Sequence, residues 1–245
     1  MAGRVEGKIA FVTGGGSGMG REHAILMAEE GASLIVSDVN EAGGRETVSM
    51  INSKGGQSLF INFDVASEAA WQAAVNQAVS TFGRVDILVN NAAVFPRTPW
   101  SALNEAAWDE AINTNLKGSF LVAKAVGDRM KAQGAGKIVN IADWAGERPY
   151  RDYLPYCVSK AGVIALTKAL ALELAPEVQV NAVAPGPVML PDDMSAKERA
   201  AVIAATPLRR IGSPEDIANA VLFLLEGSDF ITGAVLPVDG GRLIA

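Results

Sequence analysis

The chain has 245 residues, with 21 Lys+Arg against 27 Asp+Glu, so its formal net charge at pH 7 is −6; hydrophobic residues make up 49% of it. That apolar share can bury a core and excludes disorder, and the acidic balance without a basic run argues against nucleic acid and anionic membranes as partners. One cysteine and one histidine are too few ligands for a Cys/His zinc site, so no metal is expected.

Short β-branched runs alternate with longer helical patterns along the chain. Strands are predicted at residues 9–13, 33–38, 58–64, 86–92, 137–142, 178–185 and 234–238. Helices are predicted at about 20–30, 41–54, 71–82, 105–133, 156–174, 196–205 and 215–225. Nearly continuous apolar strands separated by helices are typical of a parallel sheet covered on both faces. We expect residues 1–245 to form one doubly wound (Rossmann) α/β domain of about seven strands, with ligands outside the carboxyl ends of the strands.

A glycine-rich loop at residues 13–20 lies between the first strand and the first helix. Its glycines allow positive φ and let the backbone approach a ligand closely. Amide groups at the start of the helix then favour a pyrophosphate. A dinucleotide is expected to contact this loop at Gly14, Ser17, Gly18, Met19 and Gly20. The alternative is a glycine-rich turn that binds nothing.

Asp38 ends the second predicted strand, 18 residues after Gly20. A carboxylate at this spacing accepts hydrogen bonds from the adenosine ribose hydroxyls. It would repel a 2′-phosphate, and the loop holds no basic residue, since Arg21 comes just after it. The pattern predicts NAD rather than NADP, the alternative being that Asp38 is only a cap or turn residue.

These residues, with motifs farther along, resemble the short-chain dehydrogenase/reductase family. The matching motifs run in family order over essentially the whole chain: Asp64-Val65, Asn90-Asn91-Ala92, Asn115, Tyr156-x-x-x-Lys160, Pro185-Gly186 and Asp239-Gly240-Gly241. The resemblance implies a nicotinamide-dependent oxidoreductase. It places Asp64 and Val65 beside the adenine, Asn91 at the cofactor, and Val188 after Pro185-Gly186 at the nicotinamide carboxamide. It gives Asn90 the role of supporting the cofactor's strand.

The resemblance also implies catalytic roles for Asn115, Tyr156 and Lys160, with Lys160 holding the nicotinamide ribose and Asn115 ordering water in a proton relay. A free tyrosine titrates near pH ~10 and is a poor proton-transfer group at neutral pH. Lys160 stands one helical turn after Tyr156, and its charge is expected to lower the pKa of the phenol. Tyr150 and Tyr153 have no lysine at that spacing.

Two minor departures from the family pattern are Ala93, in place of the family's glycine after Asn-Asn-Ala, and Leu190, where a threonine often follows Pro-Gly. A third departure is large. Family members usually have a serine 13 residues before the tyrosine, where this chain has Asp143. An aspartate there resembles the pteridine-reductase branch, although that branch carries an arginine in the glycine loop and uses NADP. Asp143 could stay protonated and donate a hydrogen bond, accept one from a substrate ring N–H, or disable hydride transfer; it could also face away from the site.

The substrate pocket is expected to be framed by Phe95, Arg97, Trp100, Trp144, Glu147, Arg148 and Arg151, the aromatic ones suiting a flat ring. Residues 187–194 would cover this pocket, and residues 190–204 have the pattern of a lid. The acidic side chains of Asp192, Asp193 and Glu198 are expected to form a solvated face or to stand at a helix start.

The predicted function is NAD(H)-dependent interconversion of an alcohol and a carbonyl compound. The alternatives are pteridine-reductase-like reduction of a C=N or C=C bond in a heterocycle, with Asp143 as acceptor or proton relay, and binding of NAD without catalysis. A cytoplasmic protein is expected, because the chain has neither a signal peptide nor an apolar run of ~18 residues. The family resemblance implies a homotetramer or dimer; the apolar stripe Val163, Leu166, Leu170 and Leu174 suits either oligomerisation or packing on the sheet.

Overall fold

The computed structural model of the protein describes residues 3–191 and 194–245. Its strands are β1 (Ile9–Thr13), β2 (Ser33–Asp38), β3 (Ser58–Asn62), β4 (Ile87–Asn90), β5 (Gly136–Ile141), β6 (Val178–Pro185) and β7 (Val235–Val238). Its helices are α1 (Gly18–Glu29), α2 (Glu41–Ser53), α3 (Glu68–Phe82), α4 (Glu105–Ala111), α5 (Ser119–Gln133), α6 (Leu154–Leu174), α7 (Ala196–Ala204) and α8 (Pro214–Glu226). Within the described residues, no helix is both long and apolar enough to cross a membrane.

The strands form one parallel sheet in the order β3-β2-β1-β4-β5-β6-β7. From β1 the chain winds outward to β3, then returns to the far side of β1 and winds outward again to β7. The direction therefore reverses between β1 and β4, and the connections leave a crevice at the carboxyl ends of these strands. The prediction of a single doubly wound α/β domain with seven strands is confirmed.

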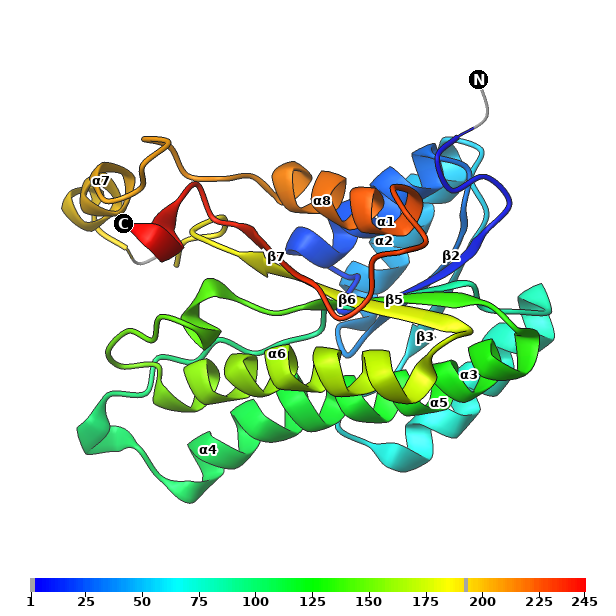
Figure 1. The fold of residues 1–245 in the computed structure, drawn as a ribbon, viewed down its shortest axis with the longest axis horizontal. Helices are drawn as coiled ribbons and strands as arrows, with labels where there is room; N and C mark the ends of the chain where they lie inside the picture. Colours follow the sequence, from blue (N-terminus) through cyan, green and yellow to red (C-terminus); the bar gives the residue numbers. More distant parts are fainter. Residues whose placement is uncertain (1–2, 192–193) are drawn as a thin grey trace.

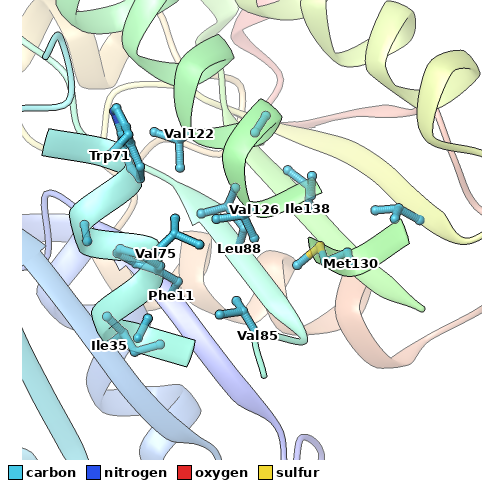
Figure 2. Close-up of a cluster of buried hydrophobic side chains, with 14 of the residues drawn as sticks. Phe11, Ile35, Trp71, Val75, Val85, Leu88, Val122, Val126, Met130 and Ile138 are labelled. Carbon is cyan, nitrogen blue, oxygen red and sulfur yellow. The ribbon is translucent and has the colours of Figure 1, made fainter. Parts of the chain in front are cut away.

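Helices cover both faces of the sheet. Figure 1 shows α1, α2 and α8 over one face and α3, α5 and α6 over the other. The middle residues of β1 are completely buried because their side chains alternate between these two layers. Phe11 packs against Trp71 of α3 with ring centroids 6.1 Å apart, in the cluster drawn in Figure 2, and Ala10 and Val12 belong to the cluster on the α1/α8 side.

The predicted helix at 105–133 is confirmed in its bounds, but its middle is not a regular α-helix. A π-helical segment, η2 (Ile112–Gly118), separates α4 from α5. Within it the Asn115 side chain bonds to Val94 and Ser159, and the Ser119 hydroxyl donates to the Asn115 carbonyl. These side-chain hydrogen bonds lie outside the regular backbone hydrogen bonding of an α-helix and accompany the wider, π-helical turn of η2. The other predicted boundaries differ from the observed ones by at most a few residues.

His23 lies on the buried face of α1, and neither of its ring nitrogens has a hydrogen-bond partner among the described residues. Burial lowers the pKa of the imidazole to about 3, because a charged ring there would lose its hydration without gaining a partner. The folded protein therefore holds His23 neutral at a pH where the unfolded chain binds a proton.

The pH dependence of stability is expected to show this difference. Below the unfolded-state pKa of 6.5, His23 binds a proton in the unfolded state but not in the native state. The free energy of unfolding therefore decreases as the pH falls. The free energy of unfolding of His23→Leu minus that of the wild type is expected to rise by about 2 kcal/mol when the pH is lowered from 7.5 to 5, as measured by urea unfolding. A wild-type-to-variant difference that is the same at both pH values would contradict a neutral buried imidazole.

Candidate active site

A cavity of about 700 Å³ opens at the carboxyl ends of the strands. Gly14 after β1, Asp38 at the end of β2, Asn91 after β4, Ala142 after β5 and Pro185 at the end of β6 all line it. This is the crevice that the reversal of strand order creates.

Every residue expected to hold the cofactor lies on the wall of this cavity. These residues are Gly14, Ser17, Gly18, Met19, Gly20, Asp38, Asp64, Val65, Asn91, Tyr156, Lys160, Pro185, Gly186 and Val188. Asn91 also fastens the glycine loop, since its amide Nδ2 donates to the carbonyls of Thr13 at 3.0 Å and Gly14 at 3.1 Å. The loop and the segment after β4 are thereby held together at one edge of the sheet.

The glycine loop has the geometry of an anion site. Gly14 and Gly18 have φ of 64° and 53°, which side-chain-bearing residues rarely adopt, and a Cβ at Gly14 would lie 2.8 Å from the Ala92 Cα. The Ser17 side chain makes no capping hydrogen bond at the start of α1, and the first turn of α1 holds no acidic residue. The first amides of α1 are therefore not capped by a side chain and fit the pyrophosphate of a dinucleotide.

The Asp38 carboxylate lies on the cavity wall and can accept further hydrogen bonds. Its Oδ2 accepts from the Gly16 amide at 2.9 Å and its Oδ1 from the Asn40 amide at 2.8 Å, which leaves each oxygen with further accepting capacity. Arg21 is engaged elsewhere: its guanidinium pairs with Glu46 at 2.6 Å and donates to the Gly16 carbonyl. Among the described residues, the cavity wall beside Asp38 includes no cation.

The hydroxyl of Tyr156 donates to Asp143 Oδ2 at 2.8 Å, and both residues line the cavity. Asp143 follows β5, and its Oδ1 accepts from the Ala145 amide at 2.7 Å, which fixes the carboxyl group. Its enclosure in the cavity wall raises the pKa of Asp143, against the opposing effects of the Ala145 and Tyr156 hydrogen bonds and of Lys160. The prediction that Asp143 could face away from the site is wrong.

The expected effect of Lys160 on Tyr156 is also wrong for the protein as described. Burial first, and then the charge of Asp143, hold the pKa of the Tyr156 phenol well above its usual value. Lys160 donates to the Ile141 carbonyl at 2.7 Å, and its Nζ lies 5.7 Å from the centroid of the Tyr156 ring. Burial lowers the pKa of this ammonium to about 8. For Tyr156, burial of the phenol and the charge of Asp143 decide the direction of the shift.

Asn115 is buried and does not line the cavity, although its neighbour Thr114 does. Its Oδ1 accepts from the Val94 amide at 2.8 Å, and its Nδ2 donates to the Val94 carbonyl and the Ser159 hydroxyl, both at 3.0 Å. In this arrangement Asn115 is a positioning residue, because it holds the segment that carries Phe95 against α6.

Five aromatic rings form one side of the cavity, which we call the aromatic wall: Phe95, Trp144, Tyr150, Tyr153 and Tyr156. Phe95 stacks on Tyr153 with centroids 4.4 Å apart and meets Tyr156 edge-on at 4.5 Å. Tyr150 continues the row, 5.3 Å from Tyr153 and 5.6 Å from Trp144. The wall thus runs from Tyr156 to Trp144 and presents apolar ring surface to a ligand.

Three arginines expected in the pocket, Arg97, Arg148 and Arg151, are not on its wall. Arg97 forms an ion pair with Asp152 at 2.8 Å, and the Arg148 guanidinium donates to the carbonyls of Arg242 and Ala245. Trp100 is 80% exposed and lies outside the cavity as well, as does Glu147. Phe95 and Trp144 do line it, together with Tyr150, Tyr153 and Arg242, which the sequence did not single out as pocket residues. The row of aromatics before Tyr156 was a usable signal, whereas nothing marked Arg242.

The predicted lid contributes Leu190, Pro191, Met194 and Val202 to the cavity wall, and the covering segment before it contributes Met189. Its helix, α7, begins with a capping box in which the Ser195 side chain and Glu198 bond to each other's backbone amides. Glu198 therefore stands at a helix start, as one of the predicted alternatives has it. Asp192 and Asp193 lie outside the described residues.

Comparisons with known proteins point to dehydrogenases and reductases. A family profile described as enoyl-(acyl carrier protein) reductase matches residues 14–242. The (2S)-[(R)-hydroxy(phenyl)methyl]succinyl-CoA dehydrogenase subunit BbsD of Thauera aromatica is 40% identical over 244 residues, which cover 97% of each chain. Cyclopentanol dehydrogenase of Comamonas testosteroni is 37% identical over 98% of each chain. A structure of 7α-hydroxysteroid dehydrogenase complexed with NADH and 7-oxo glycochenodeoxycholic acid is 35% identical, with a TM-score of 0.94 over 97% of this chain and 95% of that one.

Titration of the tyrosines tests the electrostatics of the site. With tyrosine ¹³C-labelled at Cζ, the chain gives three ring signals to follow by NMR, assigned through single Tyr→Phe variants. The Tyr156 signal is expected not to titrate up to about pH 10, because burial and Asp143 both disfavour tyrosinate. Asp143→Asn removes a negative charge and is expected to lower the pH at which Tyr156 begins to titrate. A Tyr156 signal that titrates near neutral pH in the wild type would contradict the raised pKa of the phenol.

Proposed function

The chain belongs to the short-chain dehydrogenase/reductase family of oxidoreductases, and we propose that it interconverts an alcohol and a carbonyl compound with NAD(H). The observation that carries this proposal is the 2.8 Å hydrogen bond between Tyr156 and Asp143, inside the same cavity as the glycine loop and Lys160. The hydrogen-bonded pair Tyr156–Asp143, which could transfer a proton, therefore faces the space where a nicotinamide and a substrate would meet.

The proposed place of the cofactor follows from the cavity wall. The uncapped start of α1 would hold the pyrophosphate, Asp38 the adenosine ribose, and Val188 after Pro185-Gly186 the nicotinamide end. A nicotinamide dinucleotide held by these residues would supply the hydride acceptor for alcohol oxidation and the hydride donor for carbonyl reduction. Asp64 and Val65 line the same cavity and would border the adenine.

Tyr156 and Asp143 together would move the proton. When an alcohol is oxidised, its hydroxyl proton passes to the Tyr156 oxygen while the phenol's own proton passes to Asp143 Oδ2 along the existing hydrogen bond. Two features favour this relay: burial makes a free tyrosinate costly, and the raised pKa of Asp143 makes its carboxylate a better base. For reduction of a carbonyl the two protons move in the opposite direction.

Lys160 would act by position and charge. Its Nζ is fixed at the Ile141 carbonyl, close to the Tyr156 ring. Its positive charge would stabilise the negative charge that the pair carries before it takes up the proton in oxidation, or after it gives the proton up in reduction. The further role that the family resemblance implies, holding the nicotinamide ribose, fits its place on the cavity wall.

The relatives favour alcohol oxidation as the chemistry. Those described above are named as dehydrogenases of an arylmethyl alcohol, of cyclopentanol and of a hydroxysteroid. With the aromatic wall beside Tyr156, they support secondary alcohols next to or within a ring as the substrate class. Reduction of a heterocycle stays a prediction. Turnover is favoured over binding alone, because Asp143, Tyr156 and Lys160 meet in one cavity.

A homo-oligomer also forms part of the proposal. Val163, Leu170 and Leu174 of the predicted stripe on α6 pack inside the protomer. Other apolar side chains of the long helices, Phe120 on α5 and Val158 on α6, are more than a third exposed and are available to a second copy of the chain.

Cofactor choice provides the test of this proposal. Oxidation of 1-phenylethanol or cyclopentanol is expected to proceed with NAD, and the appearance of reduced nicotinamide is measured by absorbance. The ratio of kcat/KM for NAD over NADP is expected to be roughly tenfold to a thousandfold, the range for like charges about 4 Å apart in a partly solvated site. Asp38→Ser is expected to narrow this ratio because it removes the charge that would repel a 2′-phosphate.

Glu41→Gln is the matched control, since Glu41 is an exposed carboxylate on α2 that does not line the cavity. It is expected to leave the ratio unchanged. A preference for NADP in the wild type would overturn the assignment of NAD, and no turnover with either dinucleotide would overturn the proposed activity.

A further inference from the structure

The last turn of the chain contributes a cation to the cavity. Arg242 begins the 3-10 helix η4 (Arg242–Ile244) and lines the cavity together with Trp144. Figure 1 shows the C-terminus beside α7, and the Arg242 Nη1 donates to the Ala205 carbonyl at the end of that helix at 2.9 Å. The guanidinium lies over the Trp144 ring, 5.1 Å from its centroid.

Few of the bonds that this guanidinium can make are present. Its side chain makes one hydrogen bond to the described residues, and none of their carboxylates forms an ion pair with it. Its Nε is buried and has no hydrogen-bond partner among the same residues. A planar guanidinium matches a carboxylate in charge and shape, so such a group is suited to an anionic ligand.

The other charged groups of the cavity lie elsewhere. Asp38 and Asp64 line the part assigned to the adenosine, and Asp143 and Lys160 surround Tyr156. Among the described residues that line the cavity, Lys160 and Arg242 are the only lysine or arginine. The aromatic wall connects their two regions, because it begins at Tyr156 and ends at Trp144, against which Arg242 packs.

We propose that Arg242 binds the carboxylate of the substrate, which is a ring-bearing hydroxy acid or the corresponding oxo acid. The hydroxyl lies at Tyr156, the ring lies along the aromatic wall, and the carboxylate lies at the end of the wall next to Trp144. This orientation separates the substrate's negative charge from Asp143 and brings it to a cation that has no carboxylate partner among the described residues. The inference rests on the proposed alcohol oxidation and names its substrate class.

A purely structural role for Arg242 makes a different prediction. The tail is also fastened by other groups: Arg148 donates to the Arg242 carbonyl at 2.8 Å, and Asp239 accepts from the amides of Gly241 at 2.8 Å and Leu243 at 2.6 Å. If Arg242 only anchored the tail, its loss would affect charged and neutral substrates alike, and so would the loss of Arg148.

The test uses a pair of substrates that differ only in charge: 4-(1-hydroxyethyl)benzoate and its methyl ester, each oxidised with NAD. In the wild type, kcat/KM is expected to favour the acid over the ester. Arg242→Met is expected to lower this ratio about tenfold to a hundredfold, mainly through KM, as for loss of a hydrogen bond between charged groups. Arg242→Lys is expected to restore part of the acid-over-ester ratio. The matched control Arg148→Met removes a contact of the tail but keeps Arg242 in the cavity, and it is expected to leave the ratio unchanged.

An equal ratio in Arg242→Met and the wild type overturns the inference, as does an equal loss in Arg148→Met. Binding of the product acid, 4-acetylbenzoate, and of its methyl ester is measured by calorimetry in parallel. If no alcohol is oxidised but the acid binds in an Arg242-dependent way, the proposed activity fails and the carboxylate site stands. If both alcohols are oxidised while acid and ester bind equally, the carboxylate site fails and the activity stands.

Discussion

A phenol and a carboxyl group share one hydrogen bond in the wall of the cavity, and this constraint shapes the site around them. The Tyr156 hydroxyl donates to Asp143, whose other oxygen is held by the Ala145 amide. Neither group can change its charge cheaply on its own, because burial disfavours both tyrosinate and carboxylate. A proton that enters through Tyr156 and ends on Asp143 takes the pair from one negative charge to none without forming a free tyrosinate, which makes the pair better suited to proton transfer than the phenol alone.

The fold brings this pair to the dinucleotide crevice through two neighbouring elements. β5 ends just before Asp143, and α6 begins just before Tyr156, so both side chains emerge at the carboxyl edge of the sheet. Lys160 joins the two elements, since its ammonium donates to the last residue of β5, Ile141. The π-helical turn at Asn115 supports the same region from the other side by holding Val94, next to Phe95. The geometry of the proposed proton relay and the packing of the helices therefore depend on the same few contacts.

Local sequence was enough to predict the sheet and the cofactor wall. In a doubly wound fold, local sequence predicts a dinucleotide site from glycines at fixed spacing after a buried strand and an acidic residue after the next strand. Gly14 and Asp38 lie on the cavity wall, where they were expected. The direction of the Tyr156 pKa could not be predicted from helical spacing, because it depends on burial and on Asp143, which belongs to another element. Arg242 was missed because its place in the cavity is decided by how the tail folds back on α7, a contact between distant parts of the chain.

The most direct test of the Tyr156–Asp143 relay is the turnover number of Asp143→Asn with NAD and a saturating alcohol. The asparagine oxygen can still accept the hydrogen bond from Tyr156, but the amide cannot take up its proton. The relay predicts that kcat falls about 10²- to 10⁴-fold, while the affinity for NADH, followed by its fluorescence, stays within a few-fold of the wild type. A variant that binds NADH and turns over at close to the wild-type rate would contradict it.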